Sequence, residues 1–348
     1  MKSRILHTII ILTYLGAICS CRKSDEAEIQ VYEIVGQQST VEINGVTRSI
    51  DIFFPESFHD ADLLAANFIL SDGAVAKVNG VIQVSGQTKN NYKLAFSYQV
   101  EAENKGNTLS WKINAANNSN TLPWGLGRFL ESKRSNDRNY EWYTDQANTG
   151  VHSSNNCGPT STTMAAKWSD LAFTKTSADA RAAYRQDGGW WYTADIDKYL
   201  IDNSIPHYFT NLSSTVTGTQ QAISSVLDNG FIVILCLDMY YIRSETSSNE
   251  RVDKFYATNS TGWGHFIVVK GYREVDDRLY FEVYDPYCFG KVYSDGVLKG
   301  RNRYYRPSDI FDATSKWWNF AIVITPKGSE KSIMTVLDPS KIPSQWGR

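Results

Sequence analysis

The segment NNCGPTSTTMAAKW, residues 155–168, places a cysteine at the start of a predicted helix. Pro159 suits the first turn of a helix, because the N–H group that proline lacks would be unpaired there anyway. Cys157 then lies at the positive end of the helix dipole, which favours the reactive thiolate. On this segment alone, a catalytic cysteine and a buried cysteine that merely begins a helix are equally good interpretations.

A histidine and an aspartate further along the chain favour the catalytic interpretation. His265 lies near the start of the apolar run GHFIVVKGY, residues 264–272, and Asp285 ends the strand-like part of YFEVYDP, residues 280–286. The polar residues between these runs predict an antiparallel hairpin with its turn near Val275. Because His265 and Asp285 are equally far from Val275, the pairing should place them side by side. A carboxylate beside one imidazole nitrogen orients the ring and leaves the other nitrogen for the sulfur.

These motifs, Asn-Cys-Gly-Pro-Thr, Gly-His-Phe-Ile-Val-Val-Lys-Gly-Tyr and Tyr-Asp-Pro, resemble those of papain-like cysteine peptidases of the bacteriocin-processing type. The resemblance covers residues 143–326 and includes the order Cys, His, Asp. It implies that the Cys157 thiolate attacks a peptide carbonyl, that protonated His265 donates to the leaving amine, and that Asp285 orients the histidine. The implied substrate is a peptide or protein, and neither a cofactor nor a metal is expected.

The resemblance also implies a glutamine upstream of the nucleophile, whose amide helps to bind the oxyanion of the tetrahedral intermediate. Gln146 is the candidate, although it lies farther from Cys157 than the shortest spacing in papain-type enzymes. Asn155 or Asn156 is the alternative donor. The backbone N–H of Cys157 would be the second donor.

The order of the patterns predicts an α+β domain that follows an all-β domain. Short strand-like runs separated by Asn-Gly and similar turns predict a small Ig-like sandwich over residues 29–114. Residues 115–120 form a polar linker, residues 121–326 the papain-like domain, and residues 327–348 a C-terminal extension. In the papain-like domain, helical patterns precede the main strands, which predicts N-terminal helices packed on an antiparallel sheet. The charged stretch 131–138 is expected to be solvated.

The first residues have the pattern of an export signal. Lys2 and Arg4 precede an apolar run that is shorter than the roughly 20 residues of a membrane-spanning helix. The segment ICSC, residues 18–21, resembles a bacterial lipobox, which implies a signal peptide over residues 1–20 and lipidation of Cys21. A polar tether then follows over residues 21–28.

This leader predicts an exported protein that is anchored in the outer membrane by its lipid, either exposed on the cell surface or facing the periplasm. A cleaved signal with free release is the alternative.

Composition argues against several other functions. The formal net charge is −2, so nucleic acid is not an expected partner. Only three cysteines, Cys157, Cys236 and Cys288, remain in the predicted folded part, which is too few for a framework of disulfides and includes no C-x-x-C pair. We interpret Cys236 as an inert core thiol and Cys288 as a structural residue.

Three functional alternatives remain open from the sequence. A thiol peptidase is the leading hypothesis, a cell-wall amidase or transpeptidase with the same triad is the second, and a non-catalytic surface adhesin is the third. The aromatic runs 190–192 and 317–318 could line a substrate groove, but packing in the core is the better supported interpretation.

Overall fold

The computed structural model describes residues 23–55, 58, 61–116, 121–128 and 130–333. The predicted signal peptide, the lipidation site at Cys21 and most of the predicted C-terminal extension lie outside these ranges. The same is true of residues 117–120, which form most of the predicted linker. None of the helices in the described ranges is long and apolar enough to span a bilayer.

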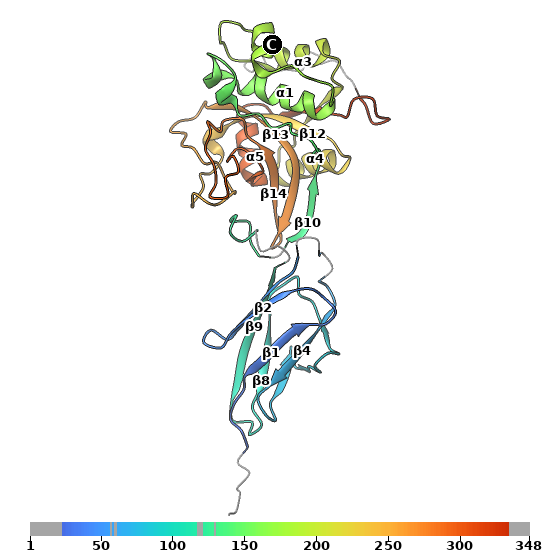
Figure 1. The fold of residues 1–348 in the computed structure, drawn as a ribbon, viewed down its shortest axis with the longest axis vertical. Helices are drawn as coiled ribbons and strands as arrows, with labels where there is room; N and C mark the ends of the chain where they lie inside the picture. Colours follow the sequence, from blue (N-terminus) through green and yellow to red (C-terminus); the bar gives the residue numbers. More distant parts are fainter. Residues whose placement is uncertain (1–22, 56–57, 59–60, 117–120, 129, 334–348) are drawn as a thin grey trace, which may run out of the picture.

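The N-terminal part consists of two β-sheets around one shared core, which we call the N-terminal sandwich (Figure 1). One sheet has the order β1-β4-β7 and the other the order β2-β3-β9-β8-β5-β6. The strands are β1 (Ile29–Ile34), β2 (Thr40–Asn44), β3 (Ser49–Phe53), β4 (Leu64–Leu70), β5 (Val75–Val78), β6 (Val81–Ile82), β7 (Lys89–Asn90), β8 (Phe96–Glu101) and β9 (Thr108–Ala116). The Ig-like identity of this part stays a prediction.

The C-terminal domain, from residue 130 onward, is built on a seven-stranded antiparallel sheet. Its order is β11-β16-β12-β13-β14-β15, and β10 also pairs with β13. The strands are β10 (Leu130–Ser135), β11 (His207–Asn211), β12 (Ile232–Asp238), β13 (Gly264–Val275), β14 (Arg278–Tyr284), β15 (Arg303–Tyr305) and β16 (Phe320–Ile324).

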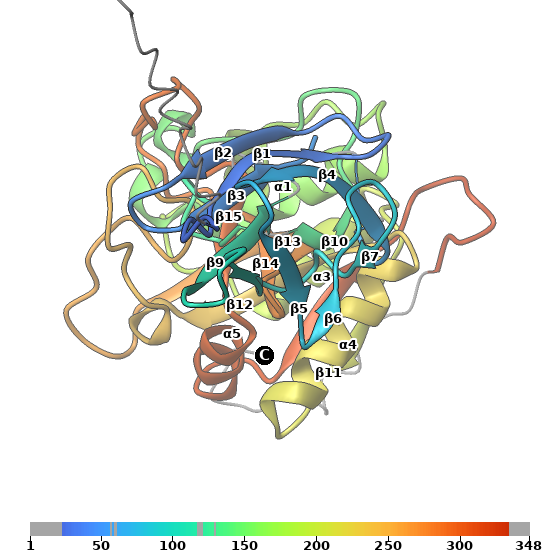
Figure 2. The same ribbon diagram turned by 90° about the horizontal axis from the view of Figure 1, so that it is seen from below.

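Helices cover both faces of this sheet (Figures 1 and 2). The central strand β12 is buried along its whole length, and its side chains alternate between two hydrophobic clusters. One cluster includes residues of α1 (Cys157–Ser169), α2 (Ser177–Ala183) and α3 (Thr193–Asp202). The other includes residues of α4 (Val216–Asp228) and α5 (Pro307–Ser315). The prediction of a mixed helix-and-sheet domain is confirmed, but it lacked the second helical layer.

Most of the charged stretch 131–138 forms β10, a strand that the sequence did not predict, and its side chains are exposed or partly exposed as expected, except for the buried Asn136. Strand β13 is 12 residues long, and β12 pairs with it only from Gly264 to Val269. The far half of β13, from Gly271 to Val275, therefore has a free edge that β10 occupies. Side chains of β10 and β13 also bond to each other at this edge, because the Ser132 hydroxyl donates a hydrogen bond to the Glu274 carboxylate at 3.0 Å.

Candidate active site

Cys157 is the first residue of α1 and is buried. The glycine that follows it allows the start of the helix to pack closely against Trp191. A Cβ atom on Gly158 would lie 2.7 Å from Cβ of Trp191, so a larger residue would push the tryptophan away. Asn156 occupies the N-cap position, but its side chain makes no capping hydrogen bond. The start of α1 is therefore not capped by that side chain.

His265 and Asp285 are in contact through a hydrogen bond of 2.7 Å between Nε2 and Oδ1. The hairpin that carries them forms as predicted, and its turn consists of Asp276 and Asp277, which directly follow Val275 and both have positive φ. The register of the two strands differs from the prediction. Together with a bulge in β13, this register makes His265 a diagonal neighbour of Asp285 instead of its direct partner.

Four hydrogen bonds saturate the Asp285 carboxylate, which is completely buried. Oδ1 accepts from His265 Nε2 and, at 2.9 Å, from the backbone N–H of Tyr287. Oδ2 accepts from the hydroxyls of Tyr256 and Tyr305, each at 2.8 Å. A carboxylate has about four lone-pair positions, so all of them are occupied.

Charge interactions oppose the cost of burying this pair. Burial raises the pKa of Asp285, but the His265 charge and the hydrogen bonds from His265, Tyr287 and Tyr256 outweigh it, so the net pKa is lowered. Burial lowers the pKa of His265, but Asp285 and the contact with Cys157 outweigh it and raise that pKa to about 10. The imidazole is therefore protonated near neutral pH.

The protonated His265 connects the carboxylate to the sulfur. Nε2 is occupied by Asp285, which leaves Nδ1 for Cys157, and the cysteine side chain interacts with the imidazole and contributes to its raised pKa. A second buried cation, Arg181, interacts electrostatically with Cys157. Two cationic side chains, His265 and Arg181, therefore interact with the sulfur of Cys157.

Comparison with known proteins identifies the domain that carries this site. Residues 138–317, just over half of the chain, match the peptidase C39-like family. The chain belongs to the peptidase C39-like family. No curated protein matches the chain. One matching solved structure is a provisionally named glycoside hydrolase from Bacteroides thetaiotaomicron, with 12% identity, coverage of 87% of this chain and 90% of the other, and a TM-score of 0.24. A TM-score of that size does not establish a common fold.

The amide side chains proposed for the oxyanion lie around the nucleophile loop of this C39-like domain, but they are engaged elsewhere. Gln146 is fully buried, and its Nε2 donates to the backbone oxygen of Ser153 at 2.8 Å. Its Oε1 has no hydrogen-bond partner among the described residues. Asn156 donates to Thr149 and accepts from Arg181 at 2.8 Å, so its amide is fully used.

Asn155 is half-buried and donates to the backbone oxygen of Gly188 at 3.2 Å. Gln146 lies against the nucleophile loop, but its atom without a partner among the described residues is Oε1, an acceptor that cannot donate to an oxyanion, while its donor Nε2 is engaged with Ser153 and Ser154. Its role in binding an oxyanion stays a prediction.

The two aromatic runs, which the sequence favoured as core residues, converge on one pocket beside the nucleophile. The pocket has a volume of about 320 Å³, and Gly264 and Phe266, the neighbours of His265, form part of its wall. It is lined by Trp190, Trp191, Tyr192, Cys236, Gly262, Gly264, Phe266, Trp317 and Trp318. Only Trp191 and Trp318 among the five predicted aromatics are fully buried, so the packing interpretation holds for part of the set.

Sequence reasoning missed three residues of the site. Tyr256 and Tyr305 donate hydrogen bonds to Asp285, and the positively charged Arg181 interacts with Cys157. Tyr256 and Tyr305 lie 29 and 20 residues from Asp285 along the chain, and no local spacing pattern links a tyrosine to a carboxylate over such a distance. Arg181 lies in the short helix α2, and no motif in the sequence analysis singled it out. Its burial and its bonds to Asn155 and Asn156 appear only in three dimensions.

The other candidate residues have structural partners. Burial raises the pKa of both Cys236 and Cys288, which favours the unreactive thiol. His207 contacts Asp197 at 2.9 Å, and His152 packs against Gly188. Among the described residues, no group of three or more His, Cys, Asp or Glu side chains is arranged to hold a metal ion.

Proposed function

We propose that the chain is a cysteine peptidase in which Cys157 is the nucleophile, His265 the general acid and base, and Asp285 the residue that orients the histidine. The observation that carries this proposal is the continuous series of contacts from Cys157 through His265 to Asp285 in a buried environment. Membership of the peptidase C39-like family supports the same reaction class.

The proposed reaction follows from the placement of these groups. The Cys157 thiolate attacks the peptide carbonyl carbon and forms a tetrahedral intermediate, whose oxyanion is bound by the Cys157 backbone N–H. The Gln146 amide is the second proposed donor, and to reach the oxyanion its Nε2 has to leave the backbone oxygen of Ser153. The His265 proton then moves to the amine nitrogen, the C–N bond breaks and a thioester remains. His265 takes a proton from a water molecule, which attacks the thioester and releases the acid and the thiolate.

The pocket beside the nucleophile supports a preference for substrates with a bulky apolar side chain near the scissile bond. Its lining is aromatic apart from one cysteine and two glycines, and it carries no charged side chain. At about 320 Å³ it lies at the small end of ligand pockets, which suits one large side chain. Trp190 is half exposed and forms part of the wall, so Trp190→Ala should lower kcat/KM for peptides with such a side chain more than for alanine peptides.

Export and a lipid anchor at Cys21 are part of the same proposal. They are supported by the basic and apolar leader and by the lipobox-like segment ICSC. The N-terminal sandwich would then act as a spacer that separates the peptidase domain from the membrane.

Selective alkylation tests the proposed nucleophile. Iodoacetamide at neutral pH should label Cys157 in the folded protein and leave Cys236 and Cys288 unmodified, because burial raises the pKa of these two thiols. Mass spectrometry of the peptides gives the result, and an unlabelled Cys157 would refute the proposal.

Activity assays test the reaction. Cys157→Ala should abolish hydrolysis of casein or a peptide library while leaving the circular dichroism spectrum unchanged. Purified peptidoglycan, assayed beside the protein substrates, separates the peptidase from an amidase with the same triad. Turnover of peptidoglycan alone would contradict the peptidase proposal.

A further inference from the structure

We propose that Tyr256 and Tyr305 are positioning residues that hold the Asp285 carboxylate so that only Oδ1 faces His265. This inference rests on the proposed function of the Cys157, His265 and Asp285 group. Both phenol oxygens lie 2.8 Å from Oδ2, the oxygen that does not contact the histidine.

An aspartate needs such bonds to keep one orientation. The last torsion of an aspartate side chain is broad, so the rotamer preference alone does not fix the carboxylate plane. The backbone N–H of Tyr287 and His265 occupy Oδ1, and the two phenols occupy Oδ2. Four directional donors define the plane of the carboxylate, and the orientation of the imidazole follows from it.

Both phenols are able to act only as donors here. Burial raises the pKa of Tyr256 and of Tyr305 well above the usual value, and the nearby Asp285 charge adds to this effect. Each hydroxyl therefore keeps its proton across the pH range in which a peptidase works and donates it in a hydrogen bond to Oδ2 of Asp285.

The two tyrosines reach Asp285 from different elements. Tyr305 ends the edge strand β15, and Tyr256 belongs to residues 239–263, the long connection between β12 and β13. Asp238 holds the two ends of this connection together, because its carboxylate accepts hydrogen bonds from the backbone N–H groups of Gly262 and Trp263, at 2.7 and 3.1 Å.

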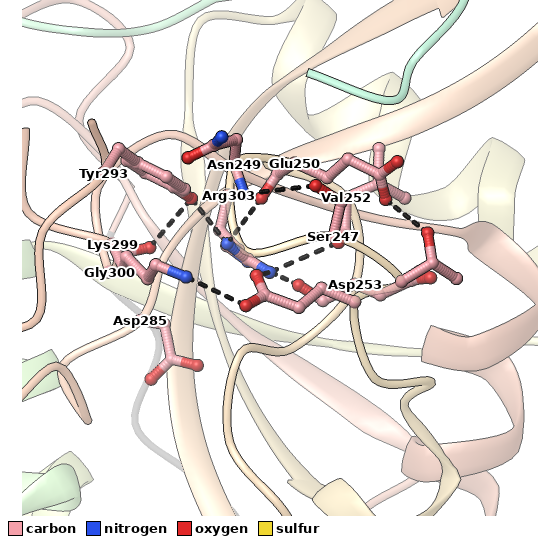
Figure 3. A network of polar contacts seen from close by, with 12 residues as sticks. Ser247, Asn249, Glu250, Val252, Asp253, Asp285, Tyr293, Lys299, Gly300 and Arg303 are labelled. Atoms are coloured by element: carbon pink, nitrogen blue, oxygen red, sulfur yellow. Dashed lines mark hydrogen bonds and ion pairs between the residues drawn. The ribbon is translucent and has the colours of Figure 1, made fainter. Parts of the chain in front are cut away.

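Arg303, two residues before Tyr305, anchors the same connection to β15 (Figure 3). It is completely buried, and its five N–H donors are all used. Their acceptors are the backbone oxygens of Glu250, Val252 and Asp253, the Tyr293 hydroxyl and the Glu245 carboxylate. Strand β15 thus supplies one tyrosine directly and fixes the loop that supplies the other.

Removal of the phenol oxygens tests the proposal without any substrate. The readout is the rate at which iodoacetamide alkylates Cys157 at pH 7, measured for Tyr256→Phe, Tyr305→Phe and the double variant. Each single change should slow alkylation about fivefold to tenfold, the equivalent of roughly one hydrogen bond, and the double change should slow it further. Tyr240→Phe is the matched control, because Tyr240 is 45% exposed on the same connection and should react at the wild-type rate.

A double-mutant cycle separates positioning from a general structural role. In an Asp285→Ala background, Tyr256→Phe and Tyr305→Phe should have no further effect, because the group through which they act is absent. The same loss in both backgrounds would overturn the proposal. Wild-type rates for both single variants would overturn it too, and Tyr305→Phe carries the test if Tyr256→Phe does not fold by circular dichroism.

The alkylation readout is independent of turnover. If wild-type protein hydrolyses no peptide but the cycle behaves as expected, the peptidase proposal fails and the positioning proposal stands. If wild-type protein is an active peptidase and the tyrosine variants alkylate normally, the positioning proposal fails alone.

Discussion

The N-terminal sandwich and the C-terminal domain bury polar groups of different kinds. In the described part of the sandwich, the buried polar side chains are neutral, and three tyrosine hydroxyls meet in its core. The hydroxyl oxygen of Tyr32 is 2.7 Å from the hydroxyl oxygen of Tyr92 and 3.3 Å from that of Tyr98. The C-terminal domain instead buries charged side chains, among them Arg303 and Asp285, which are completely enclosed.

This difference shows where the fold pays a high cost of desolvation. Burying a charge costs several kcal/mol unless partners compensate it, and a hydrophobic replacement is often at least as stable. Among the described residues of the C-terminal domain, several buried charges lie at the proposed triad or in the loop that carries Tyr256, whereas Lys270, Glu282 and Asp197 are buried elsewhere. The buried charges at the site hold its side chains in position. The sandwich core contains no buried charge among its described residues, which is what a core that only stabilises the fold requires.

The largest expected effect is that of removing the buried arginine. Arg303→Met should destabilise the C-terminal domain by about 3–5 kcal/mol, because five acceptors lose the hydrogen bonds of Arg303, and Glu245 keeps only its bond from Lys299. Arg301→Met is the control on the same segment. Arg301 pairs with the exposed Glu141 at 2.9 Å, and its loss should barely move the midpoint of urea unfolding. Equal midpoints for the two variants would contradict the contrast between buried and exposed charges.

The pH dependence of stability should also separate the two parts. The pKa of His265 is raised to about 10, so its stabilising effect is complete below the unfolded value of about 6.5 and is lost as the pH rises towards 10. The C-terminal domain should lose roughly 1 kcal/mol per pH unit over this window. Thermal unfolding at pH 6.5, 8 and 9.5 measures the loss.

The sandwich provides the internal reference for that experiment. Its buried tyrosines have raised pKa values because of their burial, so they destabilise it only at pH values above their usual pKa of about 10. His265→Gln should flatten the pH dependence of the C-terminal domain, and an unchanged slope would show that another group is responsible.

A smaller effect is expected in the sandwich core. Tyr32→Phe removes the hydroxyl that joins Tyr92 and Tyr98, which should destabilise the sandwich by about 1 kcal/mol. The alkylation rate of Cys157 should stay at the wild-type value. A slower rate would mean that the sandwich influences the active site, contrary to the spacer role proposed for it.

The smallest effect concerns an exposed ion pair of the sandwich. Lys77 and Glu101 approach to 2.8 Å on neighbouring strands, but both side chains are partly exposed to water. Lys77→Gln should leave the urea midpoint of the sandwich within experimental error of the wild type. A clear loss would show that the sandwich, too, depends on individual charges.

Much of the site was accessible from local patterns. The cysteine before Gly-Pro, the histidine near the start of an apolar strand and the aspartate at the end of the next strand each follow from spacing and chemistry. The hairpin prediction also placed His265 and Asp285 near one another, although the turn at Asp276 and Asp277 and the bulge in β13 changed their relation from direct to diagonal. A bulge adds a residue to one strand only, and a hydrophobic alternation of a few residues does not reveal it.

Other features had no local signal. β10 was expected as a solvated segment because its residues are charged, and its strand exists because β13 is longer than β12. The pocket joins residues 190–192 with residues 317–318, more than 120 residues apart. Arg181 and Arg303 are residues that sequence patterns assign to the surface, and their burial depends on acceptors supplied by distant loops.

The sequence by itself determined the central strands β12, β13, β14 and β16, the helix that begins at Cys157 and the order of the proposed triad, because these depend on side-chain periodicity and on contacts between near neighbours. Only the tertiary structure decided the second helical layer, the aromatic pocket and the two phenols on Asp285. These depend on which long-range surfaces meet, and a buried carboxylate accepts whatever donors the folded chain brings to it. The three residues of the proposed triad are thus visible in the sequence, while the groups that hold them in place are visible only in the fold.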